Sequence, residues 1–128
     1  LEEELRACGL NLGDGLKGLA NVVSRVAPLF LMADPADIRA VPMVRSPLSG
    51  GPTLFIYDTY PGGVGFSRKL FDLHEIILAA AADRLDACAC ESGCPACTGS
   101  ALDAGDLAKR SAREILRRAT RAVAAAEA

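Results

Sequence analysis

The fold of this protein is decided by residues 88–97, CACESGCPAC, which place four cysteines within ten positions. The spacing is C-x-C-x3-C-x2-C, with the thiols at Cys88, Cys90, Cys94 and Cys97. Zinc prefers a tetrahedral set of ligands, and four thiolates complete that set without leaving a position for water or substrate. The pattern therefore predicts a structural Zn2+ site, with one ion per chain, rather than a catalytic site.

Three other roles compete with zinc for these four residues, which we call the cysteine cluster. An iron–sulfur cluster also uses four thiolates, so residue type alone leaves that alternative open. Disulfides are disfavoured because Cys88 and Cys90 are too close to bridge easily and no secretory signal is present. A thioredoxin-like redox pair at Cys94 and Cys97 lacks the surrounding βαβ pattern and leaves the other two cysteines unexplained. Cys8 is expected to be an ordinary small apolar side chain.

Apolar spacing on both sides of the cluster predicts a small α+β fold, with about three helices around a small antiparallel β-hairpin. Helix one is expected after a turn at residues 13–15, with an apolar stripe that runs from Leu16 to Phe30. Its last residues, 29–32, are all apolar, and we expect this end of the helix to be buried on every side. Residues 40–44 and 53–60 predict the two strands, because they are rich in β-branched, aromatic and other apolar side chains.

The cluster is expected to form a zinc knuckle between helices two and three. Helix two is predicted from about residue 66 to 87 and helix three from about residue 103 to 126. Ala108, Ala112 and Ile115 fall on one side of helix three at helical spacing. The other side carries basic side chains, namely Arg110, Arg113, Arg117 and Arg121. We expect this arginine face either to be simply solvated or to contact DNA phosphates or an acidic partner.

Length and composition predict one domain. A chain of 128 residues, 51% apolar and 23% charged, suits a single compact core. Residues 1–12 are expected to be an acidic stub that precedes a domain over residues 13–128. The sequence begins at Leu1, shows no signal peptide, and contains no apolar run near the ~20 residues of a membrane helix. We therefore expect an excised segment of a cytoplasmic protein without a membrane span.

Three stretches follow one another in a characteristic order: residues 28–38 (PLFLMADPADI), residues 55–65 (FIYDTYPGGVG) and the cysteine cluster. This order resembles the MrfA-like zinc-binding domain, a family long catalogued as a domain of unknown function. The resemblance covers residues 15–98, so residues 1–12 and the third helix lie outside its sharp motifs. In this family the four cysteines hold zinc, which implies the same role for the cysteine cluster here.

The resemblance also implies a function. Such domains lie at the C-terminal end of DEAD/DEAH-box DNA helicases of the MrfA and Hrq type, which are linked to DNA repair. The implied partners are the helicase ATPase core of the parent chain and DNA. The present sequence contains neither a G-x-x-x-x-G-K-[ST] loop nor an Asp-Glu-Ala-His box, so the isolated chain is expected not to be an enzyme.

Two alternatives belong to other functional classes. The first is a zinc-stabilised protein-interaction module of a defence or regulatory complex, without direct DNA contact. The second is an enzyme that uses Asp58 or His74, which would require a deep polar cleft around them. We instead interpret the group after the second strand as structural turn residues, because Asp and Gly commonly serve turns. These residues are Asp58, Gly62, Gly63 and Gly65.

Overall fold

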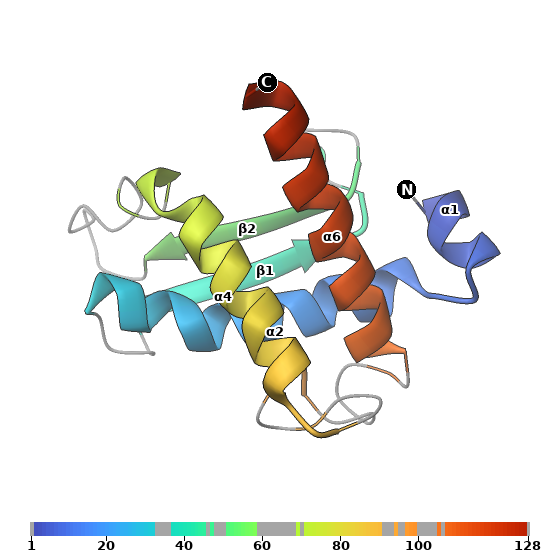
Figure 1. Ribbon diagram of the computed structural model, residues 1–128, viewed down its shortest axis with the longest axis horizontal. Helices are drawn as coiled ribbons and strands as arrows, with labels where there is room; N and C mark the ends of the chain where they lie inside the picture. Colours follow the sequence, from blue (N-terminus) through green and yellow to red (C-terminus); the bar gives the residue numbers. More distant parts are fainter. Residues whose placement is uncertain are drawn as a thin grey trace.

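The computed structural model describes residues 2–32, 37–45, 47, 51–58, 69, 71–90, 94, 97–99, 105 and 107–127, with the backbone course alone at 2, 58 and 120–127. Its elements are α1 (Glu2–Ala7), α2 (Leu12–Leu31), β1 (Ile38–Met43), β2 (Thr53–Asp58), α4 (His74–Ala87) and α6 (Ala108–Glu127). The predicted α+β fold is confirmed, with an antiparallel hairpin and the cysteine cluster between α4 and α6 (Figure 1).

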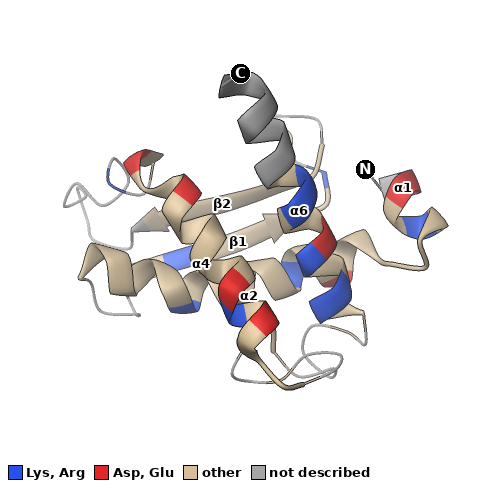
Figure 2. Ribbon diagram, viewed as in Figure 1, with Lys and Arg blue, Asp and Glu red and all other residues tan. Residues whose placement is uncertain are grey.

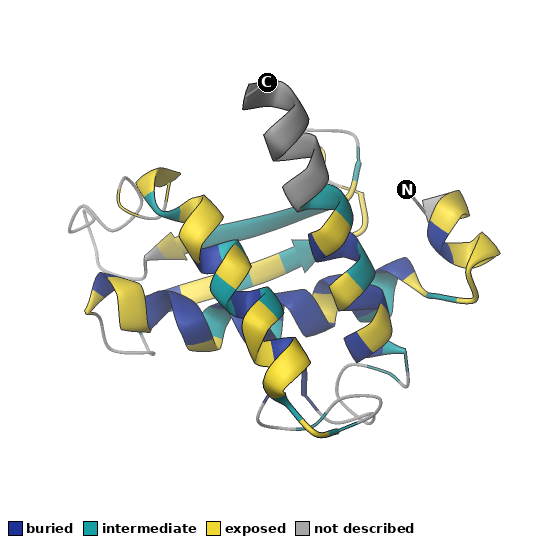
Figure 3. Cartoon of the chain, viewed as in Figure 1, coloured by how far each residue is buried: buried dark blue, intermediate teal, exposed yellow. Residues whose placement is uncertain are grey.

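Helix α2 lies at the centre of the fold. It contacts α6, β1 and α4, and Figure 1 shows α4 and α6 crossing it while the β1–β2 hairpin runs alongside. Its buried side chains include Leu16, Leu19, Val23 and Val26, at the helical steps that the sequence predicted. Figure 3 shows that buried residues concentrate along this helix. The core is therefore organised around α2.

Helix α2 begins earlier than predicted. Asn11 is its N-cap, and the Asn11 side-chain oxygen accepts a hydrogen bond from the Asp14 N–H at 2.9 Å. Capping of this kind satisfies a backbone donor that the first helical turn would otherwise leave without a partner. Residues 13–15 consequently form the first turn of the helix, and the prediction of a separate turn there is wrong.

The glycines of α2 allow a close approach of α6. A Cβ atom at Gly15 would lie 2.7 Å from the Ser111 Cβ and 2.7 Å from the Ile115 Cδ1. A Cβ atom at Gly18 would lie 3.2 Å from the Cβ of Ala108 in α6 and 3.0 Å from the Thr98 Cβ. These distances are shorter than ordinary carbon–carbon contacts of about 3.5–4.0 Å. The α2–α6 crossing therefore depends on the absence of side chains at both positions.

The C-terminal end of α2 is more exposed than predicted. Leu31 is buried, but Leu29 is 70% exposed, Phe30 41% and Met32 95%. The prediction that this end is buried on every side is wrong, because the described helices and strands cover only its Leu31 side. Met32 ends the helix with a left-handed backbone, φ 54°, and its N–H donates to the carbonyl of Pro28.

The hairpin presents one face to α2 and the other outward. Strand β1 pairs antiparallel with β2, with Arg39 opposite Tyr57 and Val41 opposite Phe55. Ile38 is buried, whereas Val41 is 38% exposed and Tyr57 43% exposed. Successive side chains of a strand point to opposite faces, so Val41 and Tyr57 belong to the outer face. Within the described residues, this outer face is partly apolar and open.

Both ends of the described chain contribute to the core. Leu5 of α1 is fully buried, and α6 buries Ala108, Ala112 and Ile115 on its predicted apolar side. The Asn11 N–H donates to the Ser111 Oγ at 3.0 Å, which joins the start of α2 to α6.

The division into residues 1–12 and 13–128 stays a prediction. Among the described residues, no helix has the length and apolarity needed to cross a membrane.

We predict that Gly15→Ala lowers the free energy of unfolding by about 1–3 kcal/mol, because the added methyl group forces α2 and α6 apart. Urea denaturation measures the change. Gly51→Ala is the control, since a Cβ atom at Gly51 meets nothing within 4 Å. The control is expected to be neutral or slightly stabilising. Equal stability of the two variants would contradict a tight helix crossing.

Candidate metal centre

The four thiols of the cysteine cluster converge just beyond the end of α4. Cys88 is the C-cap residue of that helix, and its N–H still donates to the Arg84 carbonyl at 3.1 Å. The Cys88 Sγ lies 3.4 Å from the Cys90 Sγ and 3.4 Å from the Cys94 Sγ. The Cys97 Sγ lies 3.4 Å from the Cys90 Sγ and 3.7 Å from the Cys94 Sγ. All four sulfurs lie within 4.8 Å of one another.

These separations fit a single metal ion. Four sulfurs placed ~2.3 Å from a tetrahedral zinc ion lie about 3.8 Å apart, close to the observed arrangement. The separations are much longer than a disulfide bond of about 2.05 Å, and all four cysteines are free. In a multinuclear iron–sulfur cluster the thiolates attach to different iron atoms, whereas these sulfurs surround one point. The geometry therefore favours one ion over the iron–sulfur and disulfide alternatives.

A compact turn carries the second half of the cluster. The Cys94 carbonyl accepts hydrogen bonds from the N–H of Cys97 at 3.0 Å and of Gly99 at 2.9 Å. Gly99 has φ 94°, a left-handed conformation that glycine adopts without strain. Cys97 and Thr98 are fully buried, so this end of the cluster reaches the core. The turn thus joins the metal site to the hydrophobic core.

Two polar side chains from other helices hold the backbone of the cluster. The Lys109 Nζ of α6 donates to the carbonyl oxygens of Cys88 at 2.8 Å and Cys90 at 2.5 Å. The Asn21 Nδ2 of α2 donates to the Thr98 carbonyl at 2.8 Å. The metal site is therefore tied to α2 and α6 as well as to α4, whose end it extends.

Neither of these side chains was predicted from the sequence. Lys109 did carry a signal, because it precedes Ala112 and Leu116 by three and seven residues and so shares the buried side of α6. A lysine in an apolar helical stripe is uncommon unless a partner satisfies it. Asn21 carried no comparable signal, since its partner lies 77 positions away in the sequence.

In the metal-free cluster, the pKa values of Cys90 and Cys97 are shifted in opposite directions. Burial raises the pKa of Cys90 to about 11, and the adjacent thiols of Cys88 and Cys97 act in the same direction. Burial also raises the pKa of Cys97, but backbone hydrogen bonds of Thr98 and Cys94 help to outweigh it and lower that pKa to about 6. Zinc binds thiolates, so metal binding has to displace the proton of Cys90.

Two arginines of the predicted face of α6 form ion pairs with acidic side chains. Figure 2 marks the basic and acidic positions along the ribbon. Arg113 pairs with Asp86 of α4 at 3.2 Å, and Arg117 pairs with Glu114 one helical turn away. Arg110 is exposed and takes part in none of the ion pairs found among the described residues. The side chain of Arg121, the fourth predicted contact, lies outside the described residues.

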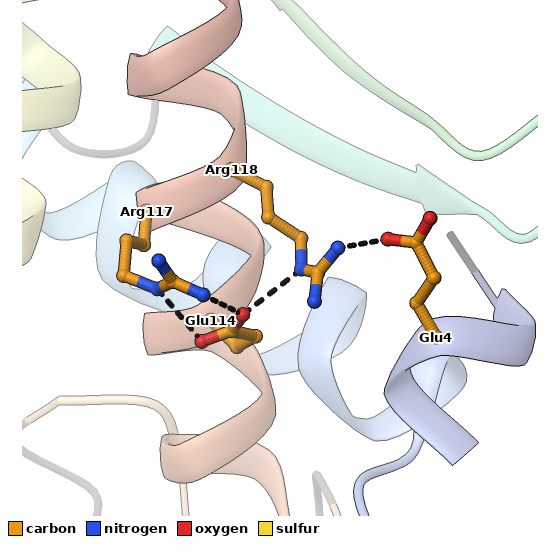
Figure 4. A network of polar contacts seen from close by, with 4 residues as sticks. All are labelled: Glu4, Glu114, Arg117 and Arg118. Carbon is orange, nitrogen blue, oxygen red and sulfur yellow. Dashed lines mark hydrogen bonds and ion pairs between the residues drawn. The ribbon is translucent and has the colours of Figure 1, made fainter. Parts of the chain in front are cut away.

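A neighbouring arginine, Arg118, which was not among the predicted contact residues, links two helices. Arg118 pairs with Glu4 of α1, and its Nε donates to the Glu114 Oε1 at 2.9 Å (Figure 4). Glu114 therefore lies between Arg117 and Arg118 and binds both. This network attaches α1 to α6.

The remaining predicted residues lie at the end of β2, beside a cavity, or outside the described part of the chain. Asp58 ends β2, while Gly62, Gly63 and Gly65 lie outside the described residues. His74 borders a cavity of about 480 Å³ between β2, α4 and α6. Its lining is mostly apolar, with Leu54, Ile56, Leu78 and Ile115 among the contributing side chains. This cavity does not match the polar cleft that an enzyme using His74 would require.

Fold and site together define a small α+β domain built around a four-cysteine metal centre. The family model of the MrfA Zn-binding domain matches residues 19–98, and the chain belongs to this family. It is therefore a zinc-binding domain with four cysteines placed to hold the ion.

Relatives of known sequence and structure are helicases. The uncharacterized ATP-dependent helicase YprA of Bacillus subtilis (strain 168) is 35% identical over 88 residues, which cover 69% of this chain and 12% of YprA. The crystal structure of the DUF1998 helicase MrfA bound to DNA matches with a TM-score of 0.76 and 33% identity, over 84% of this chain and 14% of MrfA.

A second MrfA structure, bound to DNA and AMPPNP, matches with a TM-score of 0.70 and 33% identity, over 80% of this chain and 14% of MrfA. The chain thus spans only 12% to 14% of the length of these relatives.

Proposed function

We propose that this chain is the structural zinc-binding domain of a larger ATP-dependent DNA helicase of the DNA repair type, and that it acts in the cytoplasm. The observation that carries the proposal is the set of four sulfurs within 4.8 Å of one another, in a fold that matches a small part of helicase chains. Cys88, Cys90, Cys94 and Cys97 are the zinc ligands. A reducing compartment suits them, because it keeps the thiols free for the metal.

Zinc in this domain is structural. Four thiolates complete the coordination shell, so no position remains for a substrate or an activated water. Binding of a structural zinc ion contributes roughly 10 kcal/mol or more of apparent free energy, which is comparable to the stability of a small domain. The ion holds α4 and the segment before α6 together, while ATP hydrolysis belongs to other parts of the parent chain.

Exposed apolar side chains support contact with the ATPase core of the parent chain. Leu29, Phe30 and Met32 protrude at the end of α2, and Val41 and Tyr57 lie on the outer face of the hairpin. Leu29, Phe30 and Met32 lie within four positions of one another, and apolar side chains gathered in this way on a folded domain commonly mark a site of protein contact. Such a contact would let the domain support the helicase core.

DNA contact is the less strongly supported part of the proposal. Arg110 is exposed, and the ion pair of Arg113 with Asp86 is solvent-accessible. Exposed pairs of this kind contribute about 0–1 kcal/mol, so a DNA phosphate can replace the carboxylate. The same pairing favours the alternative of a protein-interaction module without DNA contact, since it reduces the positive charge of α6. Substitution of Arg110 distinguishes DNA contact from the protein-interaction module.

Zinc ligation can be tested with two cysteine variants. We expect the wild-type chain to contain one zinc per molecule, and Cys94→Ser to lose stoichiometric zinc and to melt at a lower temperature. Atomic absorption and circular dichroism measure these changes. Cys8→Ser is the control, because Cys8 is exposed and lies outside the cluster. A Cys94→Ser protein with unchanged metal content and melting temperature would exclude Cys94 as a ligand.

Contact with the ATPase core can be tested in the full-length parent protein. Leu29→Asp is expected to reduce DNA-dependent ATPase activity at least severalfold, because a carboxylate in an apolar contact is desolvated without a partner. The melting temperature of this domain should barely change, since Leu29 is 70% exposed. Lys17→Asp is the control, as an exposed site elsewhere on α2. Wild-type activity of Leu29→Asp would argue against this docking surface.

The role of α6 in DNA binding can be tested by salt-dependent titration of the parent protein with single-stranded DNA. If Arg110 contacts a phosphate, Arg110→Gln weakens binding and reduces the slope of log K against log salt by about 1. Arg25→Gln, at an exposed position on α2, serves as the control. Identical anisotropy curves for the wild type, Arg110→Gln and Arg25→Gln would favour the protein-interaction module.

A further inference from the structure

Lys109 occupies an unusual place for a lysine. Of the charged side chains in the described part of the chain, it alone is buried, with 3% of its surface exposed. It lies in the second position of α6, between the buried Ala108 and Ser111. Its ammonium group points at the cysteine cluster, where it meets the carbonyl oxygens of Cys88 and Cys90.

Burial of this ammonium group requires compensation. Removing an ion from water costs several kcal/mol unless an opposite charge and hydrogen bonds replace the solvent. The two carbonyls are neutral, and none of the ion pairs among the described residues includes Lys109. Hydrogen bonds are thus present, but a carboxylate partner is not found in the described part of the chain.

A zinc-loaded cysteine cluster would supply the opposite charge. A Zn2+ ion bound by four thiolates leaves the centre dianionic, and metal centres depend on the groups that surround their ligands. The Lys109 Nζ binds the backbone of two residues that carry these thiolates, so it lies beside the centre. A neutral donor could satisfy the two carbonyls, but only a cation also offsets the excess negative charge.

We propose that Lys109 is the positioning residue and counter-charge of the zinc centre. Its two hydrogen bonds hold the Cys88–Cys90 backbone so that both sulfurs face the ion, and its charge stabilises the thiolate form of the cluster when zinc is bound. The inference rests on the proposed zinc ligation.

The same contact couples zinc to the position of α6. Without the metal, the four sulfurs are no longer held around one point, so the Cys88–Cys90 backbone that Lys109 binds is no longer fixed. Loss of zinc should therefore release the first turn of α6 from the cluster. The close packing of Gly18 against Ala108 lies next to this turn, so the α2–α6 crossing should loosen there as well.

The test compares three substitutions at Lys109 in the full-length protein. Lys109→Met removes both charge and donors, Lys109→Gln keeps donors without charge, and Lys109→Arg keeps both. Lys17→Met is the matched control, because Lys17 is exposed on α2. Zinc affinity is measured by competition with a chromogenic chelator, and Co2+ absorption reports the tetrahedral thiolate geometry.

We expect Lys109→Met and Lys109→Gln to bind zinc 10–100-fold more weakly than wild type, the usual effect of removing a partner of metal ligands. The zinc affinity of Lys109→Arg should stay within about threefold of the wild-type affinity. The affinity of Lys17→Met should equal that of wild type. Hydrogen exchange of the first turn of α6 should rise in the two neutral variants even at saturating zinc.

Each other outcome has a separate meaning. Wild-type protein without stoichiometric zinc would refute the proposed zinc ligation. If wild type holds zinc and Lys109→Met binds it with the same affinity, only the role of Lys109 is overturned. Wild-type affinity in Lys109→Gln would show that hydrogen bonding suffices, which overturns the counter-charge. If Lys109→Met does not fold, the proposal is decided by the zinc affinity of Lys109→Arg divided by that of Lys109→Gln. A ratio of about ten or more supports the proposal, and a ratio near one overturns it.

Discussion

The convergence of four sulfurs on one point is the constraint on which the rest of the domain depends. Four like thiolates so close together repel one another and stay together only around a cation. In this chain they join the end of α4 to the turn at Cys97 and Thr98, which lies in the core. The end of α4 and the turn at Cys97 are therefore brought together at the cysteine cluster.

Close helix packing and metal binding support each other. Gly15 and Gly18 let α6 approach α2 without intervening side chains, and this approach brings the first turn of α6 to the cluster. Lys109 reaches the carbonyls of the first two cysteines from that turn, while Asn21 holds the carbonyl of Thr98 from α2. Three helices thus meet at the site, although only α4 leads directly into it.

The surface of the domain fits a part of a larger protein. Leu29 and Met32 project from the end of the central helix, where an independent domain would place polar side chains. The chain matches only a small fraction of its helicase relatives, which agrees with this distribution of apolar surface. A closed thiolate shell also suits a supporting role, because it leaves the metal without an open coordination position.

The sequence by itself determined the cysteine cluster, the hairpin and the apolar side of α6, because each depends on spacing over a few residues. Only the tertiary structure decided which side chains attach the cluster to its neighbours, since Lys109 and Asn21 act on residues 19 to 77 positions away. It also decided that Leu29 is exposed and that Gly15 lies in a helix crossing. Composition and periodicity reveal that a side chain is apolar or absent, but only the packing of distant segments determines what it contacts.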